Sequence, residues 1–349
     1  MLAALAAVAP GQPLREGLER IREAGLGALI VVSDDPAVLA ICSGGFLLDA
    51  AFTPQRLSEL AKMDGAIILA NDASRIARAN VHLVPDPTVP TSETGTRHRT
   101  AERVARSLGV PVTSVSESRD AITVYLEDEQ RPLVPSSMLL ARANQALQTL
   151  EQYRKRLDAT SAELAALEVE DLVTLRDAVS LLQRAEMVRR IAEEIEVAII
   201  ELGTDGRLVR LQLEELLGGA TDDLRLVLRD YLRDDADWGL DDAIDVLDSF
   251  RDEELLDLRL VASRMRLAGV SADLDESLEP RGYRLLARVP RLPEPLVERI
   301  VDRFGFLQKV LRATPQEIAE VAGLDESRAR AIKESLGRLA ETSILDHYA

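Results

Sequence analysis

The stretch TPQRLSELAKMDGAIILA, residues 53–70, joins a helix to a buried strand through a tight turn. Thr53 is a typical N-cap residue and Pro54 suits the first helical position, which predicts a helix that runs to about Lys62. The apolar run at residues 66–69 then predicts a strand. A helix that leads directly into a strand is typical of domains in which helices cover a sheet.

The same alternation extends on both sides of this stretch. Residues 14–24 and 96–108 have helical spacing, and a glycine follows each, as is common at helix ends. We therefore expect residues 1–135 to form an α/β or α+β domain, with helices interleaved with a mixed, twisted sheet. Further apolar runs predict four more strands, at residues 26–32, 79–84, 110–115 and 121–126.

The remainder of the chain has a different composition. Residues 136–280 are rich in Leu, Ala, Glu and Arg, and no proline stands between Pro135 and Pro280. Apolar residues recur there every three to four positions, which predicts a helical spine. Prolines return in residues 281–349 between short helices, so a small all-α domain is expected at the end of the chain. Breaks between the spine helices are expected at residues 203–206, 218–219 and 238–239.

Charge is distributed unevenly along the chain. The formal net charge is −18, from 42 basic and 60 acidic side chains. Residues 1–140 contribute −4, residues 141–280 contribute −16 and residues 281–349 contribute +2. An acidic surface repels nucleic acid, so any binding of DNA is expected in the last of these segments.

The chain has one cysteine, Cys42, so neither an internal disulfide nor a multi-cysteine zinc site is expected. Cys42 stands in an apolar run without a neighbouring base, and we interpret it as a small buried hydrophobe. A chain without disulfides suits the reducing cytoplasm. No run approaches the roughly 20 apolar residues of a membrane span, so we expect a soluble cytoplasmic protein with no membrane partner.

A carboxylate stands in the turn before the strand at residues 66–69. Asp64 precedes Gly65, whose missing side chain permits a tight turn and the close approach of a ligand. Such a carboxylate can hold a divalent cation or accept a proton from a hydroxyl group. Asp-Gly before a strand is also a common turn, and this plain interpretation stays open.

The sequence GTRHRTAER, residues 95–103, begins the helix predicted over residues 96–108 with cations and hydroxyls. Cations at a helix start oppose the helix dipole, and the neighbouring arginines repel one another. A polyphosphate resolves both conflicts, because free N–H groups, guanidinium groups and hydroxyls can all contact its oxygens. The alternatives are a solvated basic patch and a phosphatase with a histidine nucleophile, although that phosphatase motif requires a glycine where Arg99 stands.

A serine and an arginine that follow another predicted strand are also suited to phosphate binding. Ser116 and Arg119 follow the strand at residues 110–115, and the ends of strands in α/β sheets are where ligands bind. On this pattern alone, a plain turn is an equally good interpretation.

The C-terminal segment contains a helix, a glycine turn and a second helix over residues 318–333. The turn at Gly323 offers backbone N–H groups to a DNA phosphate, and the second helix projects Arg328, Arg330 and Lys333. A degenerate copy of this arrangement occurs over residues 286–304. An ordinary helical hairpin is the alternative.

The segments LSELAKMDGA and GTRHRTAERVARSLGVPV look like the two signature motifs of the DisA family of diadenylate cyclases, and the resemblance covers nearly the whole chain. It implies a cyclase domain at residues 1–135, a spine at 136–280 and a DNA-binding helix-hairpin-helix domain at 281–349. The implied enzyme is a nucleotidyltransferase that joins two ATP molecules into cyclic di-AMP and releases two pyrophosphates. The resemblance also implies an octamer with cyclase domains face to face, Mg²⁺ or Mn²⁺ as the ion, and branched DNA as a partner in DNA-integrity checking.

The resemblance also assigns roles to individual residues. Asp64 resembles the family's metal-linked acid, which helps to activate the ribose 3′-hydroxyl. The implied catalytic set is Asp64, Arg97, His98 and Arg99. The implied ATP contacts are Asp64, Gly65, Ala66, Leu83, Thr96, Arg97, His98, Arg99, Thr100, Ser116 and Arg119. The implied DNA contacts are Gly323, Arg328, Arg330 and Lys333.

The chain departs from the family pattern at one position, since Asp325 stands where the family more often has a second glycine. Its carboxylate would lie near a DNA phosphate, which bears on the strength of DNA binding and leaves the predicted fold unchanged. A non-enzymatic alternative is a DNA-binding scaffold with a nucleotide-sensing head. Incubation with ATP separates that scaffold from a cyclase.

Overall fold

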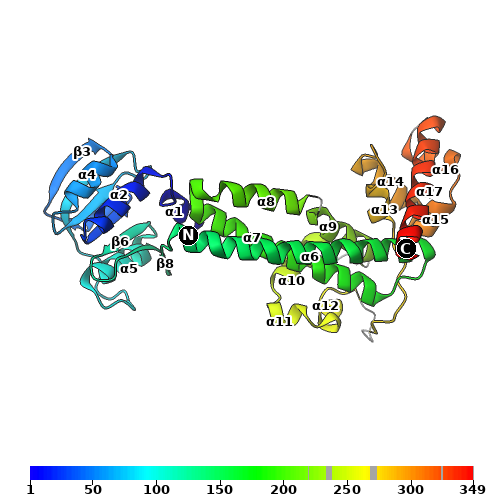
Figure 1. Cartoon of the computed structure of the whole chain (residues 1–349), viewed down its shortest axis with the longest axis horizontal. Coiled ribbons are helices and arrows are strands. Elements are labelled where there is room, and N and C mark those ends of the chain that lie inside the picture. The colour runs from blue at the N-terminus through cyan, green and yellow to red at the C-terminus, as the bar shows by residue number, and fades with distance from the viewer. Residues whose placement is uncertain (219, 233–237, 268–272, 324, 349) are drawn as a thin grey trace. The chain divides into compact units, whose positions relative to one another are not determined.

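The computed structural model (Figure 1) describes residues 1–218, 220–232, 238–267, 273–323 and 325–348. The chain divides into two compact units. The first unit comprises residues 1–145 and 194–212, and the second comprises residues 146–193 and 213–349. Gly219, in one of the predicted breaks, and Leu324, next to the predicted glycine turn, lie outside the described residues.

The first unit contains a mixed sheet of eight strands, which confirms the predicted fold class. The strand order is β2-β5-β4-β1-β6-β7-β8, with β3 also paired to β5. The pairing of β1 with β4 is parallel and the other pairings are antiparallel. The strands are β1 (Ala28–Val32), β2 (Cys42–Ser43), β3 (Phe46–Ala51), β4 (Ala66–Leu69), β5 (Arg75–Leu83), β6 (Val112–Ser116), β7 (Ala121–Leu126) and β8 (Glu129–Pro132).

Helices cover both faces of this sheet. Successive strand residues point to opposite faces, and both faces carry apolar residues that need to be buried. Ile30 and Ile67 belong to the core beneath α2 and α4, whereas Val31 and Ile68 belong to the core beneath α5. Cys42 is half-buried and not buried as expected, since β2 lies at the end of the strand order. The helices of this part are α1 (Leu2–Ala7), α2 (Pro13–Glu23), α3 (Pro36–Ala40), α4 (Pro54–Leu60) and α5 (Thr96–Leu108).

The predicted spine is helical. The expected break at residues 203–206 is the 3-10 turn η1 (Gly203–Gly206), and the break at 238–239 directly precedes α10. The helices are α6 (Ser136–Glu170), α7 (Leu175–Leu202), α8 (Arg207–Leu217), α9 (Ala220–Tyr231), α10 (Leu240–Asp248), α11 (Asp252–Leu255) and α12 (Leu258–Arg264).

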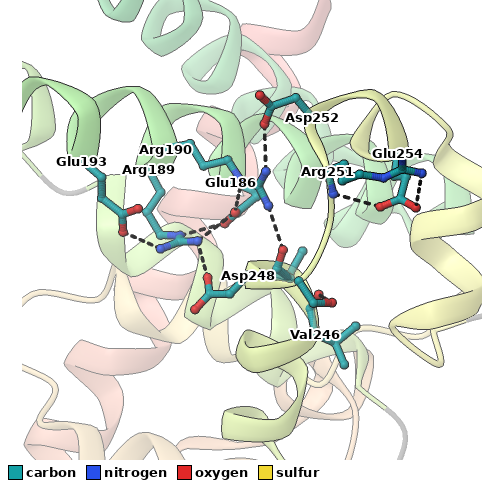
Figure 2. Close-up of polar contacts among 11 residues, drawn as sticks. Glu186, Arg189, Arg190, Glu193, Val246, Asp248, Arg251, Asp252 and Glu254 are labelled. Atoms are coloured by element: carbon teal, nitrogen blue, oxygen red, sulfur yellow. Dashed lines mark hydrogen bonds and ion pairs between the residues drawn. The ribbon is translucent and has the colours of Figure 1, made fainter. Parts of the chain in front are cut away.

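An ion-pair network attaches α10 and α11 to α7 within the second unit (Figure 2). Glu186 is fully buried and accepts hydrogen bonds from Nε of Arg189 at 2.8 Å and from Nε of Arg190 at 2.7 Å. The same arginines reach Asp248 at the end of α10 and Asp252 at the start of α11. Because the buried carboxylate has two partners, its charge is compensated inside the helical core.

The C-terminal helices pack around one apolar core. The turn between α13 and α14 has Arg291 at φ 60°, and the turn after α16 has Gly323 at φ 63°, both in the left-handed region. The second turn matches the predicted hairpin, and the first lies within the degenerate copy over residues 286–304. The helices are α13 (Tyr283–Ala287), α14 (Glu294–Phe304), α15 (Leu307–Arg312), α16 (Pro315–Ala322) and α17 (Glu326–Tyr348).

Within the described part of the chain, every helix falls short of the apolar length that crossing a bilayer requires.

Candidate functional site

A cavity of about 550 Å³ opens beside the turn that leads into β4. Four segments that are distant in sequence form its wall: β1, the α4–β4 turn, β5 and the start of α5. Seven of the residues expected to contact ATP are therefore brought together around one space. The lining residues are Leu29, Asp64, Gly65, Ala66, Val81, His82, Leu83, Gly95, Thr96, Arg97 and Thr100.

Gly65 allows the turn to pass close to β5. A Cβ atom at this position would lie 2.5 Å from Cα of Asn80, which is closer than real Cβ contacts occur. Asn80 itself has φ 53°, and the pairing of β4 with β5 shifts register between Ala66 and Ile68. A short polar residue such as Asn tolerates that left-handed backbone. The irregular pairing and the missing side chain together hold the turn against the sheet.

Asp64 presents its carboxylate to the cavity. Its side chain is 98% exposed, and Oδ1 lies 3.3 Å from Nη2 of Arg97 at the start of α5. An exposed ion pair of this kind contributes little to stability. Both groups are therefore available to a ligand that carries phosphates and a hydroxyl.

Arg97 reaches Asp64 by passing over the backbone of Gly27, just before β1. A Cβ atom on Gly27 would clash with Nη1 of Arg97, so any other residue at position 27 would displace the guanidinium group. No sequence pattern indicates this close approach, because Gly27 stands inside an apolar run that is typical of a strand.

The start of α5 is open to an acceptor. Gly95 is the N-cap, and among the described residues no side chain caps the first turn and no acidic residue stands in it. Thr100 Oγ1 donates to the Thr96 carbonyl oxygen at 3.0 Å, and both threonines line the cavity. Free backbone N–H groups, two hydroxyls and one guanidinium group therefore surround the space beside Asp64, which is the arrangement expected for a polyphosphate.

His98 was expected to hold phosphates, yet it does not line the cavity. The residue is only 8% exposed, and its Nδ1 lies 3.0 Å from Tyr125 Oη and 3.1 Å from Ser114 Oγ. Burial lowers the pKa of His98, which favours the neutral ring. The structure thus turns His98 toward the sheet and away from its neighbour Arg97.

The remaining predicted contacts lie outside the lining of this cavity. Arg99 is exposed, and Ser116 is buried with its hydroxyl accepting the Arg119 N–H at 3.3 Å. Arg119 Nη1 lies 3.6 Å from Glu93 Oε2. The Ser116–Arg119 turn is therefore ordered by its own hydrogen bond and by Glu93.

The predicted DNA-contacting residues lie on the Gly323 turn and the helix after it. Arg328 Nε lies 3.7 Å from Asp325, and Arg330 Nη2 lies 3.0 Å from Glu326, with all four side chains exposed. Lys333 differs, because its ammonium group donates to the Leu311 carbonyl at the end of α15 and is partly buried. Burial lowers the pKa of Lys333.

Two family models match this chain. The DisA bacterial checkpoint controller nucleotide-binding model matches residues 15–130, and the linker region of the same family matches residues 133–273. A DNA integrity scanning protein DisA from Frankia alni is 54% identical over 347 residues, 99% of this chain and 97% of that protein.

The chain belongs to the DisA family.

Other DisA relatives are as extensive in their coverage. The protein from Acidothermus cellulolyticus is 54% identical over 99% of this chain and 95% of its own length, and that from Streptomyces coelicolor is 51% identical over 100% and 94%. Among solved structures, DacA from Staphylococcus aureus is 22% identical over 38% of this chain and 87% of its own, with a TM-score of 0.29. As a DisA-family member the chain is a diadenylate cyclase, a nucleotidyltransferase, and the cavity lies in its nucleotide-binding domain.

Some of the residues that line the cavity have no distinguishing signal in the sequence. Leu29, Val81 and His82 come from strands in which they look like ordinary sheet residues. The sequence places Gly95 directly before the predicted helix, but nothing in the pattern indicates that Gly95 lines a cavity. The strand pairing of β1, β4 and β5 brings them to the cavity, and single-sequence periodicity does not reveal that pairing.

Proposed function

We propose that this protein condenses two ATP molecules into cyclic di-AMP and releases two pyrophosphates. The observation that supports this most directly is the shared cavity, in which the Asp64 carboxylate faces the open, cationic start of α5. A carboxylate beside a triphosphate site can act on the ribose hydroxyl that attacks the second nucleotide.

In the proposed reaction the 3′-oxygen of each ATP attacks the α-phosphorus of the other. The new bond joins the 3′-oxygen to that phosphorus, and the bond from the α-phosphorus to the bridging oxygen of pyrophosphate breaks. The proton of the hydroxyl passes to Asp64. Arg97, Thr96, Thr100 and the first N–H groups of α5 neutralise the charge that develops on pyrophosphate.

Each copy of the chain brings one Asp64 and one α5 to its cavity. We propose that each copy binds one ATP and that two cavities face each other across a contact between copies. A homo-oligomer, an octamer by family resemblance, would supply that arrangement. A monomer would then be inactive, because no second α-phosphorus would stand within reach of its nucleotide.

A divalent cation suits this site, and we propose Mg²⁺ or Mn²⁺. Within the described residues no group of three His, Cys, Asp or Glu side chains could hold a metal alone. A single exposed carboxylate such as Asp64 is nevertheless what Mg²⁺ uses when substrate phosphates complete its coordination. Such an ion would neutralise phosphate charge and lower the pKa of the 3′-hydroxyl when bound.

Product analysis tests this proposal. The full chain is incubated with ATP and Mn²⁺, and the products are separated by chromatography. We expect one cyclic di-AMP for every two pyrophosphates, with a rate per protein that falls on dilution as copies separate. Orthophosphate as the product would indicate a phosphatase, and the absence of product would indicate a nucleotide-sensing scaffold.

We further propose that the C-terminal helices bind branched DNA. The Gly323 turn and the exposed Arg328 and Arg330 support this, on the segment whose net charge is +2. A contribution from Lys333 would require its release from the Leu311 carbonyl.

Salt-dependent binding to a four-way junction tests the DNA proposal. The double variant Arg328→Ala, Arg330→Ala should bind more weakly and lower the slope of log affinity against log salt by about 2, one for each lost phosphate contact. Arg338→Ala, an exposed arginine farther along α17, is the control and should change neither value as much. If Arg338→Ala alone lowers the slope by about 1, half the effect of the double variant, then only the general charge of the helix matters.

A further inference from the structure

We propose that His98 is a positioning residue, which fixes the rotation of α5 from inside the domain so that Thr96, Arg97 and Thr100 face the nucleotide. This inference rests on the proposed cyclase function and assigns His98 a role apart from phosphate contact. It is carried by the polar cluster on the inner side of α5, which the reaction described above does not use.

The cluster joins α5 to two neighbouring strands. His98 Nδ1 lies 3.1 Å from Ser114 Oγ on β6 and 3.0 Å from Tyr125 Oη on β7. Ser114 is fully buried and Tyr125 is 1% exposed. Buried polar groups must satisfy their hydrogen bonds with one another, so these contacts favour one orientation of the His98 ring.

The same cluster holds the loop that precedes the helix. Tyr125 Oη donates to Glu93 Oε1 at 3.0 Å, so one phenol contacts both α5 and the loop. The buried Glu102, one turn further along α5, accepts the Ser92 N–H at 3.0 Å and the Thr91 hydroxyl at 2.5 Å. The loop before Gly95 is thus tied to α5 directly, through Glu102, and indirectly, through Tyr125, which contacts both Glu93 and His98.

The position of His98 determines the directions in which the neighbouring α5 side chains point. Successive residues of an α-helix are about 100° apart, so Thr96 and Thr100 each lie about 160° from His98, nearly opposite to it. Arg97 and Arg99 lie on the two flanks, about 100° to either side. With His98 held against the sheet, the threonines must face outward to the cavity, and only the Arg97 flank faces Asp64. This also explains why Arg99 is absent from the lining.

The chemistry of the ring agrees with an anchoring role. Burial favours neutral His98, and a neutral imidazole offers a phosphate less attraction than a guanidinium group does. The residue therefore serves the reaction through the groups it orients.

The test compares variants of the full chain by steady-state cyclic di-AMP synthesis and thermal unfolding. His98→Leu fills the buried site but removes both hydrogen bonds, and His98→Asn keeps a polar group near the Nδ1 position. Val104→Ala, on the buried face of the same helix, is the control for lost packing. A misplacement of catalytic groups by about 1 Å costs on the order of 100-fold in rate.

We expect His98→Leu to lower kcat by roughly 10- to 100-fold, and His98→Asn to recover at least about tenfold of it. Val104→Ala should keep kcat within about 3-fold of the wild type while its Tm falls at least as far as that of His98→Leu. Tyr125→Phe, which also removes the contact to Glu93, should show the same selective loss of kcat. The inference is overturned if His98→Leu loses no more kcat than Val104→Ala, or if Asn gives no recovery. A wild-type protein that makes no cyclic di-AMP would instead overturn the proposed function.

Discussion

Asp64→Asn is expected to lower cyclic di-AMP synthesis by about 10²- to 10⁴-fold, the usual contribution of a positioned acid or base. The substitution keeps the shape of the side chain and removes the negative charge that would hold the cation and accept the hydroxyl proton. Because the Asp64 side chain is 98% exposed, its charge supports no buried contact and Tm should stay unchanged. Chromatography of the products and thermal unfolding measure the two effects.

A matched control is available on the preceding helix. Glu59→Gln also removes an exposed carboxylate, which pairs with Lys62 at 2.7 Å, but Glu59 does not line the cavity. This variant should synthesise cyclic di-AMP at the wild-type rate. Full turnover by Asp64→Asn would remove Asp64 from the mechanism, whereas equal losses in both variants would point to a general effect of surface charge.

The elements that were predictable from the sequence are those whose signals are local. The helix at residues 96–108 was predicted with its observed bounds because apolar spacing defines it and Gly109 ends it in a left-handed conformation, at φ 64°. Thr53 caps α4 through the Arg56 N–H at 3.1 Å, as its residue type predicts. The predicted strands appear as β1, β4, β5, β6 and β7, each with buried residues on it.

Three strands were not predicted, because their signals are weak. β3 is exposed over most of its length, with Leu47 77% exposed, so it lacks the alternation of buried and exposed residues that marks a strand. β8 is exposed throughout, and β2 has only two residues. Such strands exist because a neighbour offers them hydrogen-bonding groups, which is a tertiary effect.

The candidate site shows the same division. Asp64, Gly65 and the run from Thr96 to Thr100 were identifiable because unusual residue types cluster in sequence. The sequence does not reveal that Arg97 lines the cavity whereas His98 does not, because the rotation of the helix decides which of two adjacent side chains faces the ligand. Gly27 matters only because an arginine crosses it, and no pattern in one sequence encodes that approach.

Arg284→Met is expected to lower the free energy of unfolding of the second unit by about 3–5 kcal/mol, the typical cost of leaving one partner of a buried ion pair uncompensated. Arg284 Nη1 lies 2.9 Å from Glu168 Oε1, and both side chains are 2% exposed. Its Nη2 donates to Ser161 Oγ at 2.9 Å, so the arginine attaches α13 to the spine helix α6. The Tyr231 hydroxyl also donates to Glu168, at 2.7 Å.

A second buried acid, Asp230, makes the contact between α13 and α6 sensitive to the loss of the Arg284 guanidinium group. Asp230 accepts the N–H groups of Gly282, Tyr283 and Arg284 at 2.6, 2.7 and 2.9 Å. Burial and the nearby Glu168 charge raise the pKa of Asp230 to about 7, while the N–H groups of Tyr283 and Arg284 and the Arg284 charge oppose the rise. Without the guanidinium group, Glu168 and Asp230 would remain as two neighbouring buried carboxyls with less to stabilise their charges.

Denaturant unfolding followed by tryptophan fluorescence measures this effect, because the single tryptophan, Trp238, lies in the second unit. Arg176→Met is the control, since its pair with Asp275 is exposed and should cost no more than about 1 kcal/mol. The double variant Arg284→Met, Glu168→Met should lose less than the sum of its single changes, because removing both charges leaves neither one unpaired. Strict additivity, or a loss for Arg284→Met no larger than for Arg176→Met, would show that the pair contributes no more than a surface contact. Non-additivity would establish that α13 and α6 are held together by a charge interaction in which each partner requires the other.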